Sequence, residues 1–252
     1  MKTTVSKYVR ALAFALFAAP LIALAAGGPA VKLDRAPVNL SNKESLQRGA
    51  ALFVNYCLSC HTASYMRYNR MTDIGLTEAQ IKDNLLFATD KPGNTMTVAM
   101  SAAEAKEWFG APPPDLTVIT RSRGSDWLYT YLRGFYRDDS RPLGWNNTVF
   151  DKVGMPHVMH DLQGHRVPVY RTELDAEGKA HPVIDRFELA QPGKLTLAQY
   201  DQAVADLVNF MTWMGEPAKM QRQTIGVMVL LFLGLFFIVA FYLKKEFWKD
   251  IH

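Results

Sequence analysis

The sequence predicts a mostly α-helical exported domain with a small β-hairpin insertion and one C-terminal transmembrane helix. Three observations support this fold class. The chain begins with a short basic and apolar leader, and it nearly ends with a long uncharged apolar run. Between them, apolar residues recur at helical spacing in two long stretches, which predicts amphipathic helices at both ends of one domain.

The leader has the features of a secretory signal peptide over residues 1–25. Lys2, Lys7 and Arg10 precede an apolar run that ends in small residues, with an A-x-A cleavage pattern at 23–25. The alternative is an uncleaved anchor, but the apolar core is short for a bilayer span. Residues 26–40 are expected to form an extended N-terminal segment.

The C-terminal run at 225–243 contains about nineteen uncharged residues, enough to cross the roughly 30 Å hydrocarbon core as a helix. No polar face interrupts it, which argues against a buried core helix. Residues 218–224 are expected to be a linker. The basic tail at 244–252 is expected in the cytoplasm, and an exported N-terminus followed by one span requires the same orientation.

The domain between these signals, residues 41–217, is predicted to begin and end with a helix. Ser41 and Glu44 fit a capping box before a helical pattern that leads to Cys57. Thr196 is the expected N-cap of a helix through Met214. These helices are expected to cross at small residues such as Gly49 and Ala50.

The middle of the domain is predicted to contain shorter elements. Three patterns favour short helices and one Pro-rich run requires an extended segment. Two strand-like patterns flank a turn and predict a hairpin. The helices are expected at 77–87, 101–108 and 125–135, the extended segment at 111–115, and the strands at 166–173 and 180–189.

The most informative motif is C-x-x-C-H, formed by Cys57, Cys60 and His61. Two thiols at this spacing can form thioether bonds to the vinyl groups of a haem, and the adjacent imidazole can bind its iron. A thioredoxin-like dithiol is the main alternative, but it requires a βαβ context, and a helical pattern precedes Cys57 instead. The motif therefore predicts one covalently bound haem c and a class I-like cytochrome c domain.

A low-spin electron carrier needs a second axial ligand, commonly a downstream Met thioether. Met155 is the predicted ligand, because Gly154 allows the backbone to approach the ring and Pro156 keeps the loop extended. Met159 is the competing candidate. The metal ligands are thus predicted to be His61 and Met155, and the nearby histidines at 157, 160 and 165 are expected to be loop or haem-edge residues.

Arginine side chains are expected to bind the anionic haem propionates. Arg121 and Arg123 follow the Pro-rich run directly, although either of them can be a plain surface arginine. The net charge of +4 is modest, and several basic residues belong to the leader and the tail, so nucleic-acid binding is not indicated.

Taken together, these motifs resemble the cytochrome c1 family, the haem subunits of the ubiquinol:cytochrome c oxidoreductase or bc1 complex. The resemblance covers nearly all of the chain after the leader. It rests on CLSCH at 57–61, APPPDL at 111–116, RSR at 121–123, VGMP at 153–156 and the C-terminal anchor after WMGEP at 213–217.

The resemblance implies a membrane-anchored electron-transfer subunit that is no enzyme on its own. It implies electron transfer from a Rieske iron-sulfur protein to a cytochrome c, assembly with cytochrome b, and a haem domain in the periplasm at the bacterial inner membrane. It places Pro113 and Arg123 at the haem. In this family a tyrosine in the helix after the R-x-R pair commonly helps to bind the haem propionate. Trp127 stands at that position here and cannot accept a hydrogen bond in the same way, so this role is not assigned to it.

Two other functions are compatible with the haem motif. A membrane-tethered cytochrome c serving a different reductase or oxidase would share the motif and the anchor but need not share the PPPDL and R-x-R elements. A haem sensor or peroxidase would keep an open sixth position on the iron, and the VGMPHVMH loop at 153–160 argues for six-coordination instead.

Overall fold

The computed structural model describes residues 31–98, 100–175 and 178–250, and it confirms the predicted fold class. Helices predominate in these residues, and the strands form two-stranded antiparallel pairs, β1 with β2, β3 with β4 and β5 with β6. The predicted signal peptide lies outside the described residues. Residues 33–40 form neither helix nor strand.

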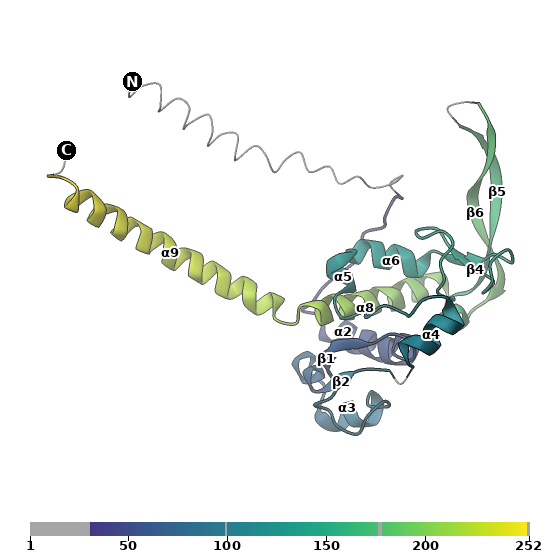
Figure 1. The fold of residues 1–252 in the computed structure, drawn as a ribbon, viewed down its shortest axis with the longest axis horizontal. Helices are drawn as coiled ribbons and strands as arrows, with labels where there is room; N and C mark the ends of the chain where they lie inside the picture. Colours follow the sequence, from purple (N-terminus) through teal and green to yellow (C-terminus); the bar gives the residue numbers. More distant parts are fainter. Residues whose placement is uncertain (1–30, 99, 176–177, 251–252) are drawn as a thin grey trace. The chain divides into compact units, whose positions relative to one another are not determined.

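The elements follow one another along the chain as shown in Figure 1. The first half contains α2 (Lys43–Leu52), the π-helical turn η2 (Phe53–Cys57), β1 (Ala63–Arg67), the 3₁₀ helix η3 (Tyr68–Ile74), α3 (Glu78–Asn84), β2 (Thr95–Met96), α4 (Ala102–Phe109), α5 (Ile119–Ser122) and α6 (Ser125–Arg133). The second half contains β3 (Phe135–Arg137), β4 (Trp145–Asn147), α7 (His160–Gln163), β5 (Gly164–Leu174), β6 (Ala180–Pro192), α8 (Leu197–Gly215) and α9 (Lys219–Phe247).

The first helix begins one residue later than the capping pattern predicts. Asn42, not Ser41, is the N-cap of α2, and its side chain accepts a hydrogen bond from the backbone N–H of Ser45. Asparagine caps a helix as well as serine does. The Ser41 N–H is already bonded to the side chain of Asn39, so the predicted capping box at Ser41 is wrong.

The last helix of the domain, α8, begins at the predicted cap. Thr196 and Gln199 form a capping box in which each side chain bonds the other residue's backbone N–H. Tyr200, Val204 and Leu207 are among its buried residues. The helix predicted from Thr196 through Met214 is therefore confirmed.

The helices α2 and α8 pack closely at a glycine. A Cβ atom built on Gly49 would lie 2.1 Å from the Asp206 carbonyl oxygen and 2.6 Å from the Phe210 Cβ. The Asp206 side chain is buried and accepts hydrogen bonds from the Ser45 hydroxyl at 2.7 Å and from the Arg48 guanidinium at 2.6 Å. This contact fixes the position of the chain just before Cys57.

The N-terminal segment is fastened to α6 and α8 by side chains of those helices. The Ala36 N–H donates to the Asp126 carboxylate at 2.8 Å, and the Asn39 N–H donates to the Asn209 side chain at 2.9 Å. Arg133 of α6 forms ion pairs with Asp34 and with Asp201 of α8. The segment thus ties the two helices together.

The predicted hairpin is present and longer than expected. Strands β5 and β6 form the long hairpin in Figure 1. They pair antiparallel from Gly164 opposite Pro192 to Leu174 opposite Ala180. Near its base, Arg166 donates hydrogen bonds to the carbonyls of Phe135 and Arg133. The hairpin base is therefore part of the domain.

The final helix begins inside the segment predicted as a linker. Residues 219–224 are helical and continuous with the apolar run. The prediction of a separate linker at 218–224 is therefore wrong. Pro217 lies just ahead of the first turn, where its missing N–H costs nothing, and good helix formers follow it. At 29 residues and a mean hydropathy of 2.8 in its most apolar window, α9 is long and apolar enough to cross a membrane.

Substitution of Gly49 by Ala is expected to lower the free energy of unfolding by about 1–3 kcal/mol, the usual cost of overpacking. The new methyl group would meet backbone atoms of α8 that cannot rotate away. Thermal unfolding of the purified chain in detergent measures this. Gly93→Ala is the matched control, because a Cβ at Gly93 meets nothing within 4 Å. Equal unfolding temperatures for the two variants would contradict the close contact between α2 and α8.

Candidate functional site

The C-x-x-C-H motif lies on a single backbone turn. Cys57 ends η2, and its carbonyl accepts hydrogen bonds from the N–H groups of Cys60 at 3.1 Å and His61 at 2.9 Å. Single-turn π segments inside helices are frequent at functional sites. The turn presents two thiols and an imidazole together, and neither cysteine forms a disulfide.

The environment of Cys57 is unlike that of a redox dithiol. Burial, with a smaller contribution from the nearby Cys60, raises the pKa of the Cys57 thiol to about 12. Reactive C-x-x-C pairs instead have a lowered thiol pKa. The helix before Cys57, formed by α2 and η2, also confirms that the βαβ context of a thioredoxin is missing at this motif.

The His61 ring is oriented by the Pro-rich segment. Its Nδ1 lies 2.8 Å from the Pro114 carbonyl oxygen. Because a carbonyl only accepts hydrogen bonds, Nδ1 carries the proton and Nε2 keeps a free lone pair. Burial lowers the pKa of His61, against the smaller effect of this hydrogen bond, and so favours the neutral ring. A histidine held in this way by a carbonyl is a typical metal ligand.

The Pro-rich segment is held in turn by Asp115, a residue that the sequence analysis did not single out. Its carboxylate accepts hydrogen bonds from the Thr62 hydroxyl at 2.8 Å, the Ser64 N–H at 2.7 Å and the Thr117 N–H at 2.8 Å. Burial raises the pKa of Asp115, but the hydrogen bonds outweigh it and lower the pKa to about 2. The sequence signal for this role is an Asp directly after the Pro run, because Asp commonly bonds a backbone N–H two residues on.

The two methionine candidates have different surroundings. Met159 is 1% exposed and lies in the hydrophobic core. Met155 is half-buried and packs against the edge of that core, and its sulfur accepts a hydrogen bond from the Tyr131 hydroxyl at 3.3 Å. A sulfur at the edge of the core is better placed to bind an added group than one enclosed by side chains.

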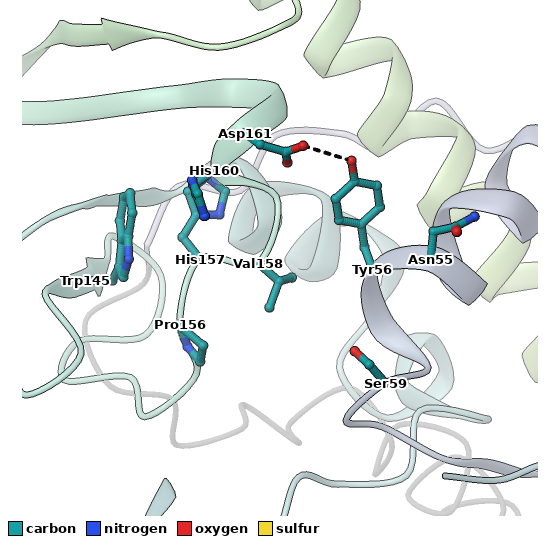
Figure 2. A pocket seen from close by; sticks show the side chains of 9 residues that line it. All are labelled: Asn55, Tyr56, Ser59, Trp145, Pro156, His157, Val158, His160 and Asp161. Carbon is teal, nitrogen blue, oxygen red and sulfur yellow. Dashed lines mark hydrogen bonds between the residues drawn. The ribbon is translucent and has the colours of Figure 1, made fainter. Parts of the chain in front are cut away.

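A cavity of about 490 Å³ separates the C-x-x-C-H turn from the Met155 loop (Figure 2). Tyr56 and Ser59 come from the turn, while Pro156 and Val158 come from the loop. Tyr56, Ser59 and Pro156 are chain neighbours of Cys57, Cys60 and Met155, and the four predicted donors do not themselves line this cavity. Two thiols, an imidazole and a thioether are the donor set that covalent haem c uses.

The histidines of the same loop have other contacts. His157 is buried with its ring stacked on Phe135 at 4.9 Å and edge-on to Trp145 at 5.1 Å. Burial lowers the pKa of His157 to about 3, so its ring is neutral. His160 is exposed at the cavity wall and makes an edge contact with His165. His160 begins α7 and His165 lies in β5, so these two are not the loop residues that the sequence predicted. A haem-edge role for the three histidines stays a prediction.

The remaining predicted residues lie on the surface or at its edge. Arg121 and Arg123 are exposed, and the Arg123 guanidinium lies 5.3 Å from the centre of the Trp127 ring. Pro113 is half-buried in the segment that holds His61. Their predicted roles at a haem stay predictions.

Comparisons with known proteins match almost the whole chain. A model of the cytochrome C1 family matches residues 35–251. A protein named cytochrome c1 from Allochromatium vinosum is 49% identical over 242 residues, 96% of this chain and 98% of that protein. The ammonia monooxygenase gamma subunit of Nitrosomonas europaea is 48% identical over 246 residues, 98% of this chain and all of that protein. The cytochrome b/c1 of Bradyrhizobium diazoefficiens is 27% identical over 264 residues, 89% of this chain and 35% of that protein.

Replacing Asp115 by Asn is expected to lower the free energy of unfolding at pH 7 by about 1–3 kcal/mol, because a charged acceptor of several hydrogen bonds is lost. The folded-state pKa of about 2 lies below the ordinary value of 3.8. The stabilising effect is therefore complete above about pH 4 and disappears as the pH falls toward 2.

Denaturant unfolding between pH 2 and pH 7 tests this expectation. The difference between the natural chain and Asp115→Asn should shrink across the acidic range. Asp83→Asn, at an exposed position, is the matched control and should have little effect at any pH. A difference for Asp115→Asn that does not change with pH would contradict the assigned role of the carboxylate.

Proposed function

Since the chain belongs to the cytochrome c1 family, we propose that Cys57 and Cys60 bind its haem c by thioether bonds and that His61 and Met155 bind the iron. Members of this family carry covalently bound haem c and act as the electron-transfer subunit of the bc1 complex. The observation that carries the residue assignment is the contact of His61 Nδ1 with a carbonyl oxygen, which leaves the ring proton on Nδ1 and the lone pair on Nε2.

The residues of the chain keep the donors in place before and after electron transfer. The haem, when bound, supplies a one-electron redox couple. Pro114 holds the His61 ring, and Asp115 holds Pro114 through the strand that follows His61. Donors fixed in this way need little rearrangement when an electron arrives or leaves. Arg123, Arg121 and Pro113 are proposed to contact the propionate side of the haem.

We further propose that a Rieske iron-sulfur protein is the electron donor and a cytochrome c the acceptor. Cytochrome b is the proposed membrane partner. The Bradyrhizobium relative supports this, because its name joins b and c1 and this chain matches 35% of its length. The apolar helix α9 supports a single-pass anchor. The predicted signal peptide supports a haem domain in the periplasm of a bacterial inner membrane.

A second candidate function follows from the Nitrosomonas relative, which is named as a subunit of a monooxygenase. In that case the chain would be a membrane-tethered haem protein serving a different oxidase. Its haem site would be the same, and only its partners would differ.

Purification of the tagged full-length chain from its native membranes in mild detergent separates these functions. The proposed function predicts that a dihaem b-type protein and a Rieske protein purify with it. A tagged unrelated membrane protein serves as the control for adventitious capture. Recovery of monooxygenase or other oxidase subunits without these two proteins would contradict the bc1 assignment.

Substitution of Met155 by Leu is expected to remove the sulfur ligand and to lower the reduction potential sharply, because thioether ligation raises the potential of a haem. Met159→Leu is the matched control, since it keeps a similar volume in the core and should change the potential little. Absorption spectra and redox titrations of the two variants measure this. The reverse pattern would assign the ligand to Met159.

A further inference from the structure

We propose that Tyr131 is a positioning residue for the Met155 sulfur and raises the reduction potential of the haem through its hydroxyl group. The inference rests on the proposed role of Met155 as an iron ligand. Its structural basis is the hydrogen bond that the Tyr131 hydroxyl donates to the Met155 sulfur at 3.3 Å. Among the described residues, Met155 is the hydrogen-bond partner of the Tyr131 hydroxyl.

The chemistry of a thioether allows both interactions at once. A Met sulfur has two lone pairs and is a weak hydrogen-bond acceptor. One lone pair can bind a metal while the other accepts the Tyr131 proton.

The Tyr131 ring is fixed by its neighbours on α6 and β3. It stacks on Trp127 with ring centres 4.9 Å apart and planes 10° apart, and it meets Phe135 edge to face at 5.1 Å. Trp127 and Tyr131 are four residues apart on α6, so they lie on one face of that helix, and Phe135 follows at the start of β3. Arg123 covers the outer side of Trp127. A ring held on both sides keeps its hydroxyl pointed at the sulfur.

The direction of the effect follows from the electron density on the sulfur. An oxidised iron withdraws density from a bound thioether more strongly than a reduced iron does, which weakens the sulfur as an acceptor. The hydrogen bond from Tyr131 is therefore stronger in the reduced protein. It stabilises that state and raises the potential, as hydrogen bonds to sulfur do at other redox centres.

Tyr131→Phe in the full-length, haem-loaded chain tests the inference. The variant is expected to keep its haem and the sulfur-ligated spectrum. At a fixed ambient potential, its ratio of oxidised to reduced protein should be about three- to tenfold higher, the equivalent of one net hydrogen bond. Tyr129→Phe is the matched control. It removes a hydroxyl from a buried tyrosine of the same helix. Among the described residues, the Tyr129 hydroxyl makes no hydrogen bond to Met155.

A double-mutant cycle separates a direct hydrogen bond from a general change in the pocket. In a Met155→Leu background, Tyr131→Phe should leave the potential unchanged, because the acceptor is already gone. A shift of the same size in both backgrounds would overturn the inference, and so would a Tyr131→Phe potential equal to that of the natural chain. These results leave the proposed function standing. A natural chain without a sulfur-ligated spectrum would instead overturn the Met155 assignment and this inference together.

Discussion

The hydrogen bond between His61 and the Pro114 carbonyl connects most parts of this structure. It fixes the tautomer of the ring, and it joins the C-x-x-C-H turn to a segment 53 residues away. The prolines of that segment cannot form a helix and hold an extended backbone, and Asp115 fastens the segment to the strand after His61. A shift of Pro114 would therefore turn the imidazole away from the direction in which it is proposed to bind the iron.

This constraint acts only because the turn itself is already in place. The missing side chain of Gly49 lets α2 approach α8, and the buried Asp206 carboxylate joins the two helices through Ser45 and Arg48. The chain leaves α2 through η2 and reaches Cys57 at a defined position. Packing between the two ends of the domain thus determines where the thiols lie.

Local signals predicted much of this from the sequence. The C-x-x-C-H spacing, the apolar C-terminal run and the Thr196 cap each depend on a few adjacent residues, and α8 and α9 follow from them. The N-cap of α2 was missed because Asn42 and Ser41 have similar capping ability. The roles of Asp115 and Tyr131 depend on partners that are distant along the chain, and no periodic pattern reveals such contacts. The assignment of Met155 over Met159 stays a prediction, supported by their different burial.

The central claim is that haem c is covalently bound through Cys57 and Cys60. The most direct measurement is the intact mass of the denatured chain, produced in cells that attach haem to a reference exported cytochrome. The natural chain is expected to have the mass of the polypeptide without its signal peptide plus one haem. A chain in which both cysteines are replaced by Ser is expected to lack that addition. A natural chain with the mass of the bare polypeptide would contradict the account.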